Sequence, residues 1–291
     1  MSKEYVIMTD SSCDLPQKLA DQLGLEVLPL EVMADGKNYR NWLDGREIGF
    51  KEFYKLAREG KELKTSAVNT AAFEEKMRKI LDEGKDLLYI GFSTGLSTTY
   101  NSGESAAREL REKYPDRKIY TVDTLAASLG QGMITYYAAK KKEEGATIEE
   151  VRDFVESEKL HMCHWFTVDD LNYLKRGGRI SAATAAIGTM LSIKPVMHMD
   201  NEGHLVAVGK ARGRKASLKA LVDSMGSTML PGRNDTIFIS HGDSIEDAEY
   251  VADLVRERTG VQDIVINYVG PVIGAHSGPG TIALFFWGRE R

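Results

Sequence analysis

Short apolar runs alternate with amphipathic stretches along the first part of the chain. A run that is apolar throughout is typical of a buried strand, and apolar residues about 3.6 positions apart are typical of a helix that covers a sheet. The pattern predicts strands at residues 5–8, 25–32, 86–91 and 118–122. Helices are expected at residues 50–58, 73–81, 126–144 and 148–156, and a further one ends near residue 114. This alternation favours βα units around a mainly parallel sheet.

The second part of the chain has a different pattern. Residues 194–199 and 205–209 flank Asp200-Asn201-Glu202-Gly203, which predicts a hairpin. Further strands are expected at residues 236–240, 263–268 and 282–287, and helices at 181–192, 214–229 and 245–258. The strand pairing should therefore be mixed. We expect an N-terminal α/β domain at residues 1–160 and a C-terminal mixed α/β domain at residues 161–291, which suits a chain too long for one core.

Composition and charge exclude some classes of partner. The formal net charge of −5 argues against binding to nucleic acid or to anionic membranes, because both need a clustered basic face. No apolar run approaches the ~18 residues of a transmembrane helix, and the N-terminus lacks the apolar region of a signal peptide. The two cysteines, Cys13 and Cys163, suit free thiols in a reducing compartment. We therefore expect a cytoplasmic protein without membrane insertion.

Three loops rich in Ser and Thr lie in comparable places, and each leads into a predicted helix. They are DSSCD at residues 10–14, TSAVNT at 65–70 and STGLSTT at 93–99. In an open α/β sheet, ligands bind at the carboxyl ends of the strands, and helix N-termini favour anions. The loops contain no Lys or Arg and no phosphate-binding GK[ST] motif, which suits a singly charged carboxylate better than a triphosphate. Each loop taken alone equally fits a helix cap or turn.

A serine esterase is the alternative function that the residues leave open. The segment Gly91-Phe92-Ser93-Thr94-Gly95 matches the G-x-S-x-G motif of a nucleophile elbow between a strand and a helix. Asp123, followed by either His241 or His276, would complete the hydrolase order of Ser, Asp and His. No metal or cofactor is expected, because the acidic residues lack the spacing of a known metal-binding loop.

Two further segments carry candidate chemistry. GPVIGAHSGPG, at residues 270–280, combines glycines that allow close backbone approach with prolines that stiffen the path. Its His276 either donates a hydrogen bond to an anion or is an ordinary loop histidine. The basic segment at residues 210–215, with Arg176 and Arg179, either contacts an acidic partner or a phosphate, or is a set of solvated charges.

Together these segments resemble the DegV family of bacterial lipid-binding proteins, which includes the fatty-acid-binding subunits of fatty acid kinase. The resemblance runs nearly from end to end. Its motifs are TDSSCDLP at residues 9–16, TS at 65–66, STGLSTTY at 93–100, DT at 123–124, LKRGGRI at 174–180, IKP at 193–195 and GPVIGAHSGPGT at 270–281. Each motif is weak by itself, but their joint occurrence in this order is specific.

The resemblance implies a two-domain α/β fold that buries a long-chain fatty acid, such as palmitate, between the domains. By motif position, hydroxyl and imidazole side chains hold the carboxylate. They are Thr65, Ser97, Ser66, Ser93, Thr94 and His276. In that family's kinase system a separate kinase phosphorylates the bound carboxylate. The resemblance therefore implies a carrier without catalytic residues or a cofactor, and a kinase subunit as its partner.

Four basic residues are candidates for contacts with the kinase or with phosphate: Arg179, Lys210, Arg212 and Arg214. The chain departs from the family pattern at two places, with Thr98 where the family has Gly and Ala67-Val68 where it has Gln-Pro. Both changes alter side chains beside the proposed carboxylate site and bear on the pose and identity of the ligand. A regulatory lipid sensor would need the same pocket, so the sequence does not separate it from a carrier.

Overall fold

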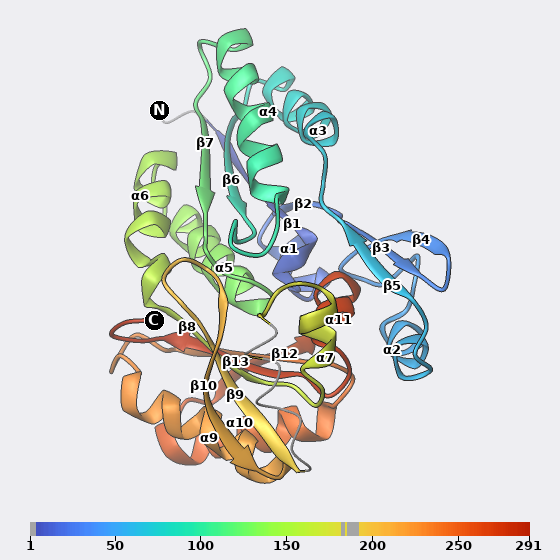
Figure 1. Ribbon diagram of the computed structural model, residues 1–291. Helices are drawn as coiled ribbons and strands as arrows, with labels where there is room; N and C mark the ends of the chain where they lie inside the picture. Colours follow the sequence, from blue (N-terminus) through green and yellow to red (C-terminus); the bar gives the residue numbers. More distant parts are fainter. Residues whose placement is uncertain (1–3, 182–183, 185–191) are drawn as a thin grey trace.

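A computed structural model describes residues 4–181, 184 and 192–291. The described residues form three sheets. Figure 1 shows the parallel sheet with its helices above the mixed sheet and a small sheet to the right. The helix expected at residues 181–192 falls largely outside the described residues. Among the helices that are described, none combines the length and apolar character needed to cross a membrane.

The four-stranded sheet is parallel and has the order β2-β1-β6-β7. Its strands are β1 (Tyr5–Asp10), β2 (Glu26–Leu28), β6 (Asp86–Gly91) and β7 (Ile119–Asp123). Helices α3 (Thr70–Asp82) and α4 (Thr99–Lys113) cover one face, and α5 (Leu129–Glu143) and α6 (Ile148–Glu158) cover the other (Figure 1). The prediction of βα units around a parallel sheet is confirmed.

A three-stranded antiparallel sheet was missed by the sequence pattern. It has the order β4-β3-β5, with β3 (Glu31–Ala34), β4 (Lys37–Arg40) and β5 (Leu63–Ser66), and α2 (Phe50–Arg58) lies between β4 and β5 along the chain. The single strand expected at residues 25–32 is wrong, because the chain leaves the parallel sheet after β2 and enters the small sheet at β3. Pro29 lies at the break, where it has no N–H to donate to a ladder.

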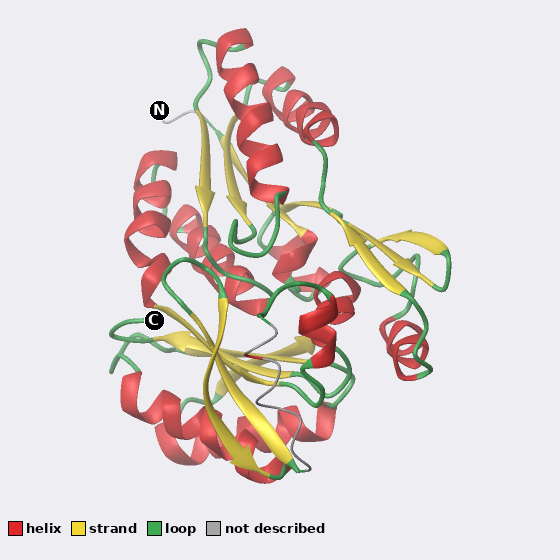
Figure 2. Ribbon diagram, viewed as in Figure 1, coloured by secondary structure: helices red, strands yellow, loops and turns green. Residues whose placement is uncertain are grey.

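The six-stranded sheet is mixed and has the order β10-β9-β8-β13-β11-β12. The strands are β8 (Met162–Thr167), β9 (Ile193–Met199), β10 (Leu205–Arg212), β11 (Thr236–His241), β12 (Asp263–Tyr268) and β13 (Ile282–Trp287). β11 and β12 are parallel, and the other neighbouring strands in this sheet run antiparallel. Helices α9 (Arg214–Thr228) and α10 (Ile245–Thr259) cover its outer face, as Figure 2 shows.

Short elements complete the described fold. They are the 3-10 turns η1 (Ser11–Cys13) and η2 (Lys159–His161) and the helices α1 (Gln17–Gln22), α7 (Asn172–Arg176) and α11 (Pro271–Ser277). The glycine-rich segment at residues 270–280 therefore contains a helix, which its composition did not indicate. Pro271 occupies the first turn of α11, where its missing N–H costs nothing.

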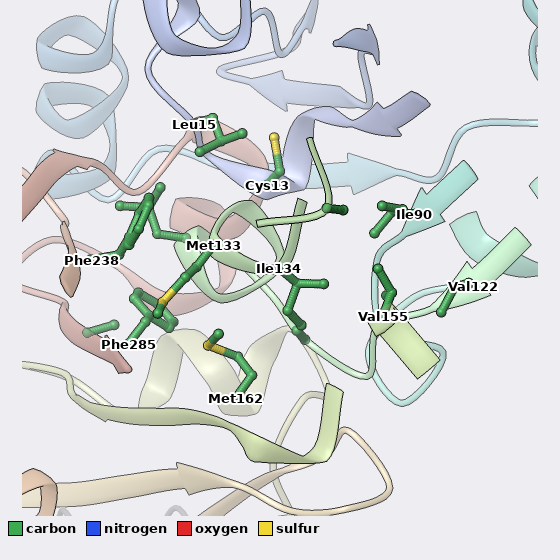
Figure 3. Close-up of a cluster of buried hydrophobic side chains, with 14 of the residues drawn as sticks. Cys13, Leu15, Ile90, Val122, Met133, Ile134, Val155, Met162, Phe238 and Phe285 are labelled. Carbon is green, nitrogen blue, oxygen red and sulfur yellow. The ribbon is translucent and has the colours of Figure 1, made fainter. Parts of the chain in front are cut away.

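Helix α5 joins the two large sheets because it is buried on both sides. In Figure 3, Met133 lies beside Phe238 and Phe285 of the mixed sheet, and Ile134 points the other way, toward Ile90 and Val155. A helix that is apolar all round belongs in an interior. The two halves therefore share one hydrophobic cluster, and the domain boundary near residue 160 stays a prediction.

Arg291 ties the same two halves together through backbone carbonyls. Its guanidinium donates to the carbonyls of Thr124 and Leu125, which follow β7. It also donates to the carbonyl of Lys159, which follows α6. On the side of the mixed sheet it donates to the carbonyls of Met162 and Asp200. Burial lowers the pKa of Arg291 to about 10, so the side chain stays charged at neutral pH. This one side chain therefore satisfies carbonyls that belong to separate loops.

Candidate functional site

A cavity of about 520 Å³ lies between the two large sheets. Its floor is one face of the mixed sheet. Strand register places Ser240 on β11 beside Ala283 on β13, and Ala283 beside Phe166 on β8, and all three line the cavity. The volume is within the ~300–1,000 Å³ that is usual for small-molecule sites.

Most of the lining is apolar. These residues come from both large sheets and from the loops between them: Leu30, Phe92, Leu96, Ala127, Phe166, Leu174, Met199, Leu205, Val269, Val272, Ile273, Ala283 and Phe285. Such a surface gains free energy when it is covered by hydrocarbon, at roughly 25 cal/mol per Å² removed from water. The body of the cavity therefore suits an apolar ligand.

Polar groups gather where the small sheet meets α11. Thr65 Oγ1 on β5 lies 2.7 Å from Nε2 of His276, in the last turn of α11. Burial, with a smaller effect from nearby Arg179, lowers the pKa of His276 to about 4, so its ring is neutral at pH 7. Its Nδ1 is buried and has no hydrogen-bond partner among the described residues.

The neutral ring of His276 has a preferred tautomer. Nδ1 lies against Gly177, where an added Cβ would be only 2.1 Å away. A buried N–H without an acceptor is rarer in proteins than a bare lone pair, so we assign the ring hydrogen to Nε2. Nε2 then donates to Thr65 Oγ1, and the hydroxyl hydrogen of Thr65 is free to point into the cavity. The hydrogen bond from His276 therefore leaves the Thr65 hydroxyl able to donate to another group.

The Ser/Thr loop after β6 supplies further hydroxyl groups. Ser97 Oγ accepts from the backbone N–H of Thr99 at 3.2 Å and lies 2.9 Å from Thr99 Oγ1. Thr94 Oγ1 donates to Asp123 Oδ2 at 2.5 Å. Ser97 and Thr94 line the cavity, as does Ser66 at the end of β5.

Arg179 brings positive charge to this end of the cavity. Its Nε donates to the carbonyl of Leu96 at 3.1 Å, and its Nη1 donates to the carbonyl of Gly177. The side chain is half-buried, and desolvation lowers its pKa. In the part of the chain that the structure describes, its hydrogen bonds go to carbonyls and not to a carboxylate. A desolvated cation beside free hydroxyl donors is an arrangement that suits an anion.

Ser93 does not belong to this group, although it was expected there. Its side chain is fully buried and is absent from the cavity lining. The hydroxyl donates to the carbonyl of Gly203 at 2.9 Å and accepts from the N–H of Gly95 at 3.1 Å. Gly203 is in the turn between β9 and β10. We therefore assign Ser93 to fastening that turn onto the Ser/Thr loop, rather than to ligand contact.

The esterase arrangement is not formed in the described structure. Asp123 accepts from Thr94, and Nδ1 of His241 accepts from the N–H of Ser244 at 3.1 Å. His276 is paired with Thr65, while the Ser93 hydroxyl donates to a carbonyl. A nucleophile and its base need to be within hydrogen-bond reach of one another, and these groups have other partners. Within the described residues, no group of His, Cys, Asp and Glu is arranged to hold a metal ion.

Sequence reasoning missed a second polar cluster that reaches the cavity. Ser128 Oγ lies 2.6 Å from Asp14 Oδ2 and 3.1 Å from Ser240 Oγ, and all three side chains are buried. Burial raises the pKa of Asp14 to about 8. Asp14 appeared in a Ser-rich loop, but Ser128 and Ser240 are isolated serines in a helix start and a strand. No sequence signal distinguishes them from ordinary core residues.

A model of the DegV family, described as an uncharacterised protein family, matches residues 4–289. The chain belongs to the DegV family. A DegV domain-containing protein of Clostridium perfringens is 46% identical over 289 residues, which cover 99% of both chains. Another, from Streptococcus pyogenes serotype M3, is 35% identical over 286 residues, with 98% of this chain and 99% of the relative covered. The resemblance inferred from the motifs is therefore confirmed.

Solved structures of DegV family proteins share the fold. One from Thermus thermophilus, described by its fatty acid binding, has a TM-score of 0.86 at 34% identity, covering 98% of this chain and 99% of that one. A Thermotoga maritima protein, described as a DegV lipid-binding protein, has a TM-score of 0.85 at 29% identity, and 99% of each chain is covered. These matches confirm the two-domain α/β fold.

The two departures from the DegV pattern lie at the cavity. Thr98 and Ala67 both line it, and Val68 is buried beside them in sequence. Thr98 adds a hydroxyl near Ser97, and Ala67 removes the bulk that a Gln would bring. Both changes therefore alter the lining of the cavity in this DegV protein.

The four basic candidates separate into two groups. Arg179 lines the cavity, as described above. Lys210 and Arg212 are exposed on β10, at the edge of the mixed sheet. Arg214 is half-buried and forms ion pairs with Asp247 at 2.8 Å and Asp169 at 3.5 Å. Its existing ion pairs leave Arg214 less available to a partner than its two exposed neighbours.

Proposed function

We propose that this DegV family protein binds a long-chain fatty acid, with the acyl chain in the cavity and the carboxylate beside the Thr65–His276 pair. Thr65 and Ser97 are the proposed carboxylate donors, with Ser66, Thr94 and His276 close by. The observation that carries the proposal is the division of one cavity into an apolar body and an end with free donors beside Arg179. Two relatives described as binding fatty acid or lipid support it.

The energetics of the site agree with such a ligand. Each buried methylene contributes about 0.8 kcal/mol, so a long acyl chain supplies most of the affinity. The carboxylate must be hydrogen-bonded where it leaves water, since a buried unpaired charge is very costly. Hydroxyl donors and a nearby guanidinium meet this need. Because Arg179 is held by the carbonyls of Leu96 and Gly177, it contributes charge without a bidentate grip on the carboxylate.

The proposal extends to delivery of the fatty acid to a separate kinase in the cytoplasm, where ATP would be available. Hydroxyl donors hold a carboxylate less tightly than a bidentate ion pair does, which leaves an oxygen available to a phosphoryl group. The product would be an acyl phosphate, and this chain would act as a carrier. Lys210 and Arg212, both exposed on β10, are the proposed contacts with an acidic surface of the kinase.

Mass spectrometry of an organic extract tests the binding function. The purified protein should release one long-chain fatty acid per chain, either as isolated or after incubation with a panel of fatty acids. Thr65→Val and Ser97→Ala should retain less ligand while melting like the wild type. An empty extract from the incubated protein would contradict the proposal.

Kinase docking is tested separately by titrating the lipid-loaded protein with a fatty acid kinase subunit. The Lys210→Glu and Arg212→Glu double variant should bind the kinase at least tenfold more weakly while keeping its lipid. Lys51→Glu, which changes an exposed lysine on α2, is the matched control. Equal kinase binding by the double variant and the control would remove β10 from the proposed interface.

A further inference from the structure

Ser277, in the last turn of α11, has a hydroxyl without a hydrogen-bond partner among the described residues. The residue is only 6% exposed, and its side chain lines the cavity. Buried polar atoms in proteins are nearly always paired, because an unpaired one has lost its water and gained nothing in return. The hydroxyl of Ser277 therefore calls for an acceptor that enters the cavity from outside.

The lack of a partner distinguishes Ser277 from the other buried polar side chains of the lining. Each of the others is hydrogen-bonded within the protein, to a neighbouring side chain or to the backbone. They are Ser128, His164, Ser240 and Thr281. Among the described residues, Ser277 is thus the one buried hydroxyl of the cavity that no protein group satisfies.

The backbone around Ser277 is held in place. The carbonyl of Ser277 accepts from Thr281 Oγ1 at 3.1 Å, and the N–H of Gly278 donates to the carbonyl of Gly274 at 2.8 Å. Gly278 has a φ of 80°, and a Cβ added there would lie 2.6 Å from the ring of Tyr173. The segment cannot easily shift toward another acceptor, so the hydroxyl is preorganised at one place on the cavity wall.

The residues of α11 that line the cavity divide between its two turns. Val272 and Ile273 belong to the first turn and are apolar. His276 and Ser277 belong to the last turn and are polar. Each polar residue follows an apolar one by four positions, so it lies on the same face of the helix about one turn, or ~5.4 Å, further along. Ser277 is therefore at the same end of the cavity as His276 and its partner Thr65.

We propose that Ser277 is a further binding residue for the carboxylate of the ligand and donates its hydroxyl hydrogen to a carboxylate oxygen. This inference rests on the proposed function and adds a residue that the sequence motifs did not assign. Successive helical residues point about 100° apart, so Ser277 approaches the head group from a different direction than His276 and Thr65 do. A carboxylate has two oxygens with about four lone-pair sites, so it can accept from both directions.

A second donor favours an acid over an alcohol of the same chain length. An alcohol presents one uncharged oxygen, and once this oxygen is paired with Thr65 it gains nothing from Ser277. Hydrogen bonds to a charged carboxylate are also about twice as strong as those between neutral groups. In the empty protein, by contrast, the unpaired hydroxyl of Ser277 is a cost to the folded state. Ser277→Ala should therefore weaken acid binding without destabilising the empty protein.

Competitive loading tests the inference. Delipidated protein is incubated with an equimolar mixture of palmitate and hexadecanol, which share one chain length, and the bound ratio is measured by mass spectrometry of an organic extract. In Ser277→Ala, the affinity for palmitate should fall about tenfold, and the palmitate-to-hexadecanol ratio should fall with it. The empty variant should melt no lower than the empty wild type.

Ser217→Ala is the matched control. Ser217 is also a buried serine in a helix, but its hydroxyl donates to the carbonyl of Arg214 at 2.8 Å, and it is absent from the described lining of the cavity. The substitution removes a hydrogen bond that the folded protein already has. Ser217→Ala should therefore lower the melting temperature and leave the palmitate-to-hexadecanol ratio unchanged.

The outcomes separate the two proposals. Wild-type palmitate affinity and an unchanged ratio in Ser277→Ala would overturn the role of Ser277 and leave fatty-acid binding intact. An unchanged ratio together with a lower melting temperature would show that the hydroxyl bonds the helix backbone instead. If the wild type retains no palmitate, then the proposed function fails as well. A ratio that falls in Ser277→Ala but not in Ser217→Ala, without loss of melting temperature, supports Ser277 as a carboxylate donor.

Discussion

The two large sheets contribute to the cavity in different ways. The parallel sheet presents its strand ends, and the loop after β6 brings hydroxyls and backbone donors to the edge. The mixed sheet presents a face, and its register lines up Ser240, Ala283 and Phe166 as a floor. A strand end supplies polar backbone and turn residues, whereas a sheet face supplies alternating side chains. We infer that the loop after β6, together with Thr65 on the small sheet, determines recognition of the head group, and that the mixed sheet determines recognition of the chain.

The largest expected effect comes from removing the hydrogen bonds by which Arg291 joins the two halves. Arg291→Ala would leave carbonyls on both sides without their donor and should lower the free energy of unfolding by about 3 kcal/mol. Arg291→Lys keeps the charge but not the planar fork, and should lose about half as much. Chemical denaturation measures both. A loss under about 0.5 kcal/mol for Arg291→Ala would mean that the shared core alone holds the halves together.

A larger side chain on the floor of the cavity tests the role of the mixed sheet. Ala283→Phe should displace about three methylenes of a long acyl chain, which corresponds to about 2.4 kcal/mol at ~0.8 kcal/mol per methylene. Binding of stearate should therefore weaken by roughly fiftyfold, and binding of laurate by much less. Competitive loading with both acids measures the ratio. An equal loss of affinity for stearate and laurate would instead indicate that the substitution disturbs binding of the head group.

Removing one head-group donor tests the polar end of the cavity. Thr65→Val should weaken binding by about 1.5 kcal/mol, roughly tenfold, and by the same factor for every chain length. Thr259→Val is the matched control, since Thr259 donates to a carbonyl on α10, which covers the outer face of the mixed sheet. A loss that grew with chain length would contradict the division of roles between the polar end and the floor of the cavity.

The smallest effect concerns Asp14, which touches both halves. It follows η1, and its carbonyl accepts from Asn267 on β12. Its pKa is raised from 3.8 to about 8, so between these values the folded protein holds a proton that the unfolded chain has released. Stability contributed by this group therefore falls as the pH rises. From about pH 7 to about pH 9, the loss should be about 1.4 kcal/mol.

Denaturation of the wild type and of Asp14→Asn at the two pH values measures this loss. The Asn side chain does not titrate, so the difference in slope isolates the carboxyl group. Equal slopes in the two proteins would show that Asp14 is already ionised at neutral pH.

Strands with a high content of apolar residues were the easiest elements to predict. The ranges expected at residues 86–91 and 282–287 match β6 and β13, which are fully buried, and the range 263–268 matches the edge strand β12. The helix expected at residues 50–58 matches α2. The small sheet was harder to predict from the sequence. Its strand β4 is polar and mostly exposed, and its pairing with β3, which identifies it as a strand, does not show in the sequence pattern. β5 was expected to be a loop for the same reason. Its mostly polar residues lack the alternation of apolar and polar positions that predicts a strand.

The polar end of the cavity was more predictable than its floor. The Ser/Thr loops after strands can be recognised in the sequence, and the glycine-rich motif identifies His276. The prediction for Ser93 was wrong, because its side chain donates to the carbonyl of Gly203 and does not line the cavity. Along β13, sequence cannot tell Ala283, which lines the cavity, from Leu284, which packs on the outer helices. Both are apolar residues in a buried strand. The direction of each side chain depends on register, which only the assembled sheet fixes.

The position of Thr65 has a consequence for local stability. β5 pairs with β3 on one side, and within the described sheets its other edge has no strand partner. Edge segments with few cooperative contacts open at a lower free energy than the core, and their amide hydrogens exchange faster. A ligand held by Thr65 would add a contact across that free edge. Amide protection along β5 should therefore rise with occupancy of the cavity, while protection in β6, at the centre of its sheet, stays constant.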